Sequence, residues 1–177
     1  ADDRDGVVPG EMALDERFTA ERLRGALGGT WPTMHVASHF VFRPGALEQS
    51  FLLLGGGQRL TLDALKTPAF AMPGVGLLTL SACGTAVGEP DATGREFESF
   101  AVLAQRQGAG AVLATLWPVT DFGTASIMAR FYRLRASSPD LAGALQRTQV
   151  ETLRRPGPQQ HPHYWAPLVL TGVPAGR

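Results

Sequence analysis

The segment that most constrains the fold is GLLTLSACGTAVG, residues 76–88. Its apolar run LLTL (77–80) carries no charge and lies between glycine-containing turns, which is typical of a strand buried on both faces of a sheet. The chain's single cysteine, Cys83, follows at the end of this run, between two small residues. Open parallel sheets bind ligands at the carboxyl ends of their strands. The segment therefore predicts a nucleophilic thiol at such an edge.

Composition predicts one globular domain with a real hydrophobic core, since 44% of the 177 residues are apolar and 18% are charged. The formal net charge of zero argues against nucleic acid or an anionic membrane as a partner. The sequence has no apolar run of about 18 residues and its N-terminus is acidic, unlike a secretion signal. A single cysteine excludes an internal disulfide and predicts a free thiol in a reducing, cytoplasmic setting.

Strand and helix patterns alternate along the chain. The segments expected to form strands are 34–39, 77–80, 111–116 and 164–170, with a hairpin of 51–54 and 59–62 around three glycines. The segments expected to form helices are 18–27, 94–107, 125–136 and one that begins at Ser138-Pro139, with a single helical turn at 63–65. Residues 1–17 are polar and broken by glycine and proline, and they are interpreted as a lead-in or linker. This alternation predicts an α/β sandwich with a largely parallel sheet.

Several polar residues stand where helices are expected to begin. Thr19 is the predicted N-cap of the first helix, and Asp121 or Thr124 that of helix 125–136. Ser138 is the predicted N-cap of the last helix, with Pro139 at its first position. The inner face of that last helix is expected to carry Leu141, Leu145 and Leu153.

Cys83 needs a basic partner, because a thiol with a pKa of about 8.5 is mostly protonated at neutral pH. His39 is the candidate, since it ends a predicted strand that would lie beside the cysteine strand. Its imidazole could hold the thiolate or protonate the leaving amine of a peptide. The N–H of Cys83 or Gly84, together with one from the turn after His39, where Phe40 follows, could bind the oxyanion of the tetrahedral intermediate. A histidine about 50 residues before the cysteine is the caspase arrangement.

Four stretches resemble the CHAT domain, a caspase-like cysteine peptidase module often found beside tetratricopeptide repeats in bacteria. They are MHVASHF (34–40), LLTLSACGTAVG (77–88), GREFESFAVLAQRQGAGAVLATLWPVTD (94–121) and HPHYWAPLVLTG (161–172). The resemblance implies a three-layer α/β/α caspase-like fold with a mostly parallel central sheet. It also implies His39 as base or proton donor and Cys83 as nucleophile. Residues 116–121 would border a groove in which a peptide adds as an extended strand.

The substrate-binding residues expected from this resemblance are Ser81, Trp117, Pro118, Val119 and Asp121. Two positions depart from the family pattern: Phe40 stands where glycine is common, and Gly84 where an acidic residue is usual. The Phe40 side chain is expected to narrow the pocket. The domain is expected to span residues 18–177 and to lack its N-terminal strands, either because the chain is a fragment or proteolytic product or because a partner chain supplies them. An upstream tetratricopeptide-repeat or other sensor region is the expected partner.

Each candidate has a plainer interpretation beside the functional one. Trp117 is a groove wall or core filler, and Asp121 is a pocket residue or, as favoured here, a helix cap. Ser81 tunes Cys83 or simply ends its strand, and Glu89, Asp91 and Glu96 select a basic substrate side chain or are solvated. His35 and His39 have the spacing of two zinc ligands on a helix, but the surrounding pattern favours a strand, so no metal and no cofactor is expected. His161 and His163 are expected in a loop, with metal binding as the weaker alternative.

The function predicted from these residues is a cysteine endopeptidase that cleaves a protein substrate through a His39–Cys83 dyad and a thioester. The alternative is a catalytically silent CHAT scaffold that binds a protein partner. A redox-sensing thiol at Cys83 is a third hypothesis.

Overall fold

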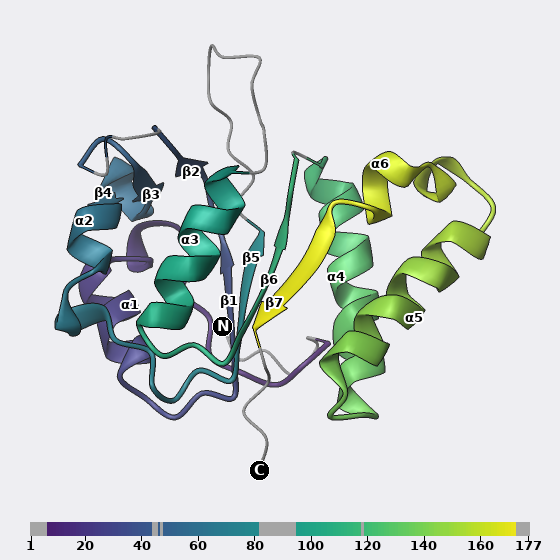
Figure 1. Ribbon diagram of the computed structural model, residues 1–177, viewed down its shortest axis with the longest axis horizontal. Coiled ribbons are helices and arrows are strands. Elements are labelled where there is room, and N and C mark those ends of the chain that lie inside the picture. Colours follow the sequence, from purple (N-terminus) through teal and green to yellow (C-terminus); the bar gives the residue numbers. More distant parts are fainter. Residues whose placement is uncertain (1–6, 44–45, 47, 82–94, 118, 173–177) are drawn as a thin grey trace. The chain divides into compact units, whose positions relative to one another are not determined.

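Figure 1 shows the computed structural model of the chain, which describes residues 7–43, 46, 48–81, 95–117 and 119–172. The chain divides into two compact units. The first, which we call the sheet unit, comprises Ala13–Pro118 and Thr171–Arg177. The second, the helical unit, comprises Ala1–Met12 and Val119–Leu170.

A four-stranded sheet has the order β1-β5-β6-β7, with β1 Thr33–Ala37, β5 Leu77–Ser81, β6 Ala111–Thr115 and β7 Leu168–Gly172. β1 pairs in parallel with β5, and β5 pairs in parallel with β6. The α/β class with a mostly parallel central sheet, as predicted from the sequence, is therefore confirmed. The alternation of these strands with helices is compatible with a three-layer α/β/α fold.

The apolar core of the sheet unit forms between one face of the sheet and the helices α1 (Ala20–Leu27) and α3 (Arg95–Arg106) (Figure 1). The strands contribute Val36, Leu78, Leu80 and Val112 to this core, and the helices contribute Leu23, Leu27, Phe100 and Ala104. On the other face of the sheet Leu77, Thr79 and Leu113 are buried as well. The cysteine strand is thus buried on both faces, as its uncharged sequence predicts.

A small antiparallel sheet follows β1 in the chain and contains the predicted glycine hairpin. Its strands are β2 (Phe40–Val41), β3 (Phe51–Leu53) and β4 (Arg59–Thr61). The hairpin turns through the 3₁₀ turn η2 (Gly55–Gly57), where Gly56 and Gly57 have φ of 63° and 75°. A side chain at Gly55 would collide with the carbonyl oxygen of Asp15, so the turn η1 (Asp15–Arg17) fixes glycine there. α2 (Leu62–Leu65) and η3 (Pro68–Phe70) lead on towards β5.

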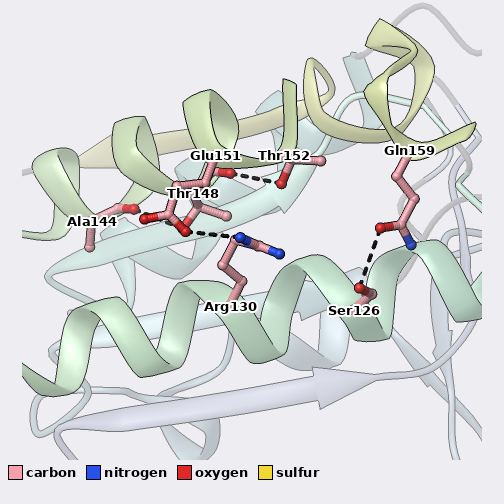
Figure 2. Close-up of polar contacts among 7 residues, drawn as sticks. All are labelled: Ser126, Arg130, Ala144, Thr148, Glu151, Thr152 and Gln159. Atoms are coloured by element: carbon pink, nitrogen blue, oxygen red, sulfur yellow. Dashed lines mark hydrogen bonds and ion pairs between the residues drawn. The ribbon is translucent and has the colours of Figure 1, made fainter. Parts of the chain in front are cut away.

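The helical unit is built on α4 (Asp121–Ala136) and α5 (Leu141–Arg154), followed by η4 (Pro158–Gln160) and α6 (Pro162–Trp165). Its buried side chains include Ile127, Phe131, Leu141 and Leu145. Figure 2 shows the polar contacts that join these elements: Arg130 to Glu151 at 2.9 Å and Ser126 to Gln159 at 3.5 Å. The Thr148 and Thr152 hydroxyls donate to main-chain carbonyls one turn earlier in α5.

Helix ends test the capping predictions directly. Thr19 caps α1 as predicted, since its Oγ1 accepts the Arg22 N–H at 3.1 Å. α4 begins at Asp121 and is capped by Thr120, whose Oγ1 accepts the Gly123 N–H, so neither Asp121 nor Thr124 is its N-cap. α5 is capped by Asp140 and not by Ser138.

Two further expectations in the helical unit were wrong. Leu153 lies on an outer face of α5 and is 42% exposed. The first part of the expected strand 164–170 belongs to α6, with Pro162 in its first turn, and β7 begins only at Leu168.

Candidate active site

Three parallel strands of the sheet unit end at the same level. The register pairs Ala37 with Ser81, the last residues of β1 and β5. It also pairs Leu80 with Ala114, which places Thr115, the last residue of β6, level with Ser81. We call the edge formed by Ala37, Ser81 and Thr115 the carboxyl rim. It is the edge at which parallel sheets bind ligands.

His39 lies two residues beyond β1 at this rim and its side chain is exposed. Its main chain is held from β3: the Leu53 N–H donates to the His39 carbonyl at 2.8 Å. The preceding Ser38 hydroxyl donates to the Leu53 carbonyl. Two hydrogen bonds to one residue of the hairpin therefore fix the backbone that carries an accessible imidazole. The strand expected to run to His39 ends at Ala37 because the chain turns here to enter β2.

Phe40 follows as the first residue of β2 and is paired with Leu52. Because main-chain hydrogen bonds on one side of an antiparallel strand alternate, the His39–Leu53 bond directs the Phe40 N–H away from β3. The Phe40 side chain is only 5% exposed and packs edge-to-face on Phe100, with ring centroids 5.1 Å apart. The Phe40 side chain therefore belongs to the core of the sheet unit.

Ser81 is half-buried at the end of β5, and its hydroxyl lies 2.7 Å from Nε2 of His35. His35 is on β1 opposite Thr79, so the hydrogen bond crosses diagonally between the two strands. The protein atoms packed around the imidazole lower the pKa of His35 to about 4, although part of the side chain remains exposed. The ring is therefore neutral at pH 7, and either tautomer satisfies the contact with the hydroxyl.

Sequence reasoning missed this role of His35, which was weighed only as a metal ligand. The available signal was the alternation of side chains between the two faces of each strand. His35 and Ala37 share a face of β1, Thr79 and Ser81 share a face of β5, and paired residues in a parallel sheet point to the same side. That signal becomes usable only once the register of β1 against β5 is known.

The predicted groove residues fall on both units. Trp117 lies two residues beyond β6, half-buried and in the sheet unit, next to the carboxyl rim. Val119 is half-buried in the helical unit, and Asp121 is the first residue of α4. The structure thus brings His39, Ser81 and Trp117 to strand ends of one sheet. Cys83, Gly84 and Pro118 lie outside the described residues.

The other histidines have local roles. His161 caps α6, where its Nδ1 accepts the His163 N–H at 3.2 Å, and the His163 ring packs on Tyr164. His161 is the N-cap of the short helix α6, and His163 lies within this helix and not in the expected loop. Within the part of the chain that the structure describes, no group of three or more His, Cys, Asp or Glu side chains could hold a metal ion. No described helix has the length and apolar character needed to cross a bilayer.

The fold has a mostly parallel sheet, and the exposed His39 and the Ser81 hydroxyl lie at the carboxyl ends of its strands. The protein is therefore of the class of α/β proteins whose candidate site lies at that edge of the sheet. Within that class the chain belongs to the CHAT domain family, whose family model matches residues 4–173. CHAT domains are caspase-like and related to peptidases. No curated protein matches the chain.

Proposed function

We propose that the protein is a cysteine endopeptidase with Cys83 as nucleophile and His39 as its acid–base partner. The register of β1 against β5 is the observation that supports this best. Ala37 and Ser81 are paired, and His39 and Cys83 each follow by two residues. Equal spacing from a paired position favours a close approach of the two side chains at one rim.

The proposed reaction is acyl transfer through a thioester. The Cys83 thiolate attacks the peptide carbonyl carbon, and the carbonyl electron pair moves to oxygen, where the N–H groups of Phe40 and Gly84 bind it. Collapse of this intermediate breaks the C–N bond, and His39 gives its proton to the leaving amine. Water, deprotonated by His39, then attacks the thioester and releases the acid and the thiolate. The outward direction of the Phe40 N–H supports its part in the oxyanion site.

The proposed substrate is a protein or peptide that binds in extended form at the carboxyl rim of the sheet unit, along Trp117 and Pro118, with Ser81 beside the reacting bond. An extended peptide adds main-chain hydrogen bonds, and pockets select its side chains. A tetratricopeptide-repeat or other sensor region is the proposed regulatory partner, in keeping with the CHAT family. The reaction needs no metal or cofactor, and the proposed compartment is the cytoplasm.

The first test is the loss of peptide cleavage in Cys83→Ala and His39→Ala. We expect Cys83→Ala to abolish cleavage and His39→Ala to lower kcat by about 10²–10⁴-fold, the usual contribution of a proton-transfer group. His163→Ala is the matched control, because His163 is another exposed histidine but lies in α6, and it should leave kcat unchanged. Cleavage that persists in Cys83→Ala would overturn the proposal.

Thiol reactivity separates an enzyme from a silent scaffold. A catalytic thiolate should react rapidly with iodoacetamide near pH 7, and His39→Ala should slow that reaction. A scaffold predicts a slow thiol in both proteins and no cleavage of any peptide. Formation of a sulfenic acid without cleavage would instead favour redox sensing.

A further inference from the structure

One face of the neighbouring strands β1 and β5 carries four polar side chains. On β1 this face carries Thr33 and His35, and on β5 it carries Thr79 and Ser81. His35 is paired in register with Thr79, yet its ring contacts Ser81, which follows Thr79 by two residues and belongs to the carboxyl rim. Nε2 of His35 lies 2.7 Å from Oγ of Ser81. We call this diagonal contact the His35–Ser81 tie.

The hydroxyl of Thr79 shows that the tie does not serve simply to satisfy buried polar groups. Thr79 is 1% exposed, and its Oγ1 has no hydrogen-bond partner among the described residues. A buried hydroxyl without a hydrogen-bond partner is costly. The imidazole opposite Thr79 is nevertheless directed to Ser81, a residue with partial access to water.

The His35–Ser81 tie lies near the carboxyl ends of β1 and β5, where it can hold the two strand ends together. In the described sheet β1 has β5 as its only strand neighbour, and beyond β1 the chain is held by Leu53 of β3 through Ser38 and His39. Strand ends open more easily than strand centres. A side-chain hydrogen bond onto Ser81, the last residue of β5, holds the two strands together where the chain leaves the sheet towards His39 and Cys83.

We propose that His35 is a positioning residue, which through Ser81 fixes the separation of the two strand ends that carry the acid–base and nucleophilic groups. This inference rests on the proposed peptidase function. His35 itself does not touch the substrate or exchange a proton with it. It acts on kcat, because a small misplacement of reacting groups lowers the rate of the chemical step without changing how the substrate binds.

Four variants test the tie. His35→Ala and Ser81→Ala remove it from either side, while His35→Gln keeps a polar atom near the position of Nε2. Thr33→Val is the matched control, since it changes a side chain on the same face of β1 whose buried Oγ1 has no partner among the described residues. Each protein is assayed for kcat and KM with one peptide and for amide hydrogen exchange at Val36 and Ser81, whose N–H groups point across the β1–β5 pair near its end.

We expect His35→Ala to lower kcat by about 10-fold or more with KM unchanged, as for a misplaced reacting group. Ser81→Ala should lower kcat by at least as much. The double variant His35→Ala/Ser81→Ala should lower kcat no further than Ser81→Ala alone does, because each single substitution already removes the same contact. His35→Gln should recover most of the rate. Amide exchange at these two positions should accelerate in the two alanine variants and remain unchanged in Thr33→Val.

The two readouts keep the failure of this inference distinct from the failure of the proposed function. Unchanged exchange in His35→Ala and Ser81→Ala would overturn the tie, whatever the activity. Faster exchange with unchanged kcat in an active enzyme would overturn the positioning role. If instead Cys83→Ala retains full cleavage, the peptidase proposal fails, and faster exchange would still establish the tie between the strands.

Discussion

The two units of the protein treat buried threonine hydroxyls in opposite ways. In the helical unit, Thr148 Oγ1 donates to the Ala144 carbonyl at 2.8 Å and Thr152 Oγ1 donates to the Thr148 carbonyl at 2.7 Å (Figure 2). In the sheet unit, the buried hydroxyls of Thr33 and Thr79 have no hydrogen-bond partner among the described residues. Both kinds of position are threonines inside regular secondary structure, so the surroundings and not the residue type make the difference.

The cause is the geometry of the backbone. A helix offers every threonine a carbonyl oxygen four residues earlier, so a buried hydroxyl is satisfied within its own helix. A strand side chain stands perpendicular to the sheet and needs a partner from elsewhere in the fold. Polar residues on the sheet therefore carry more information about function than polar residues in the helices, and the contact of His35 with Ser81 is the clearest example.

The largest expected effect tests whether the helical unit depends on its apolar core more than on its polar contacts. Phe131 is fully buried and Phe122, on the same helix α4, is 81% exposed. Phe131→Ala should lower the free energy of unfolding by about 3–5 kcal/mol through lost burial and a cavity. Phe122→Ala should change it by no more than about 0.5 kcal/mol. Urea unfolding measures both, and equal effects would contradict the core assigned to this unit.

A smaller effect, with a difference in sign, tests the comparison of the hydroxyls themselves. Thr148→Val removes a satisfied hydroxyl and should lower the free energy of unfolding by about 1 kcal/mol. Thr79→Val removes a hydroxyl without a partner from a strand interior, where valine is favoured, and should be neutral or stabilising. Thermal unfolding of the two variants checks this. A marked loss in Thr79→Val would show that its hydroxyl is satisfied in solution.

The sequence predicts the sheet unit well because its signals are local and strong. The uncharged run 77–80 identifies the buried strand β5, the three glycines identify the β3–β4 turn, and Thr19 identifies the start of α1. Each of these features is decided by the residues themselves: by burial on both faces, by positive φ, and by a side chain that accepts a nearby N–H.

The helical unit was harder to predict because neighbouring residues compete for one role. Ser138 and Asp140 can both cap α5, and the carboxylate of Asp140, which also favours a helix N-terminus by its charge, does so. The apolar pattern around Tyr164 fits a strand or a helix, and Pro162 in the first turn decides for α6.

At the carboxyl rim, the sequence predicts that His39 and Ser81 lie near strand ends, but it does not predict which side chains contact one another there. Whether the imidazole of His35 or another group lies beside Ser81 depends on the register of β1 against β5. A shift of register by one residue would turn each side chain to the other face, and no local pattern fixes the register between two distant strands.

The smallest expected effect concerns the ion pair between α4 and α5. Arg130 and Glu151 approach to 2.9 Å, with side chains that are 19% and 45% exposed, so water and salt screen much of their attraction. A double-mutant cycle with Arg130→Gln and Glu151→Gln should give a coupling of about 0.2–1 kcal/mol that shrinks as salt is raised. A coupling well above this range, and insensitive to salt, would mean that a polar contact rivals the Phe131 core in this unit. The contrast between the two units would then fail, because tertiary polar contacts would contribute as much to the stability of the helical unit as to that of the sheet unit.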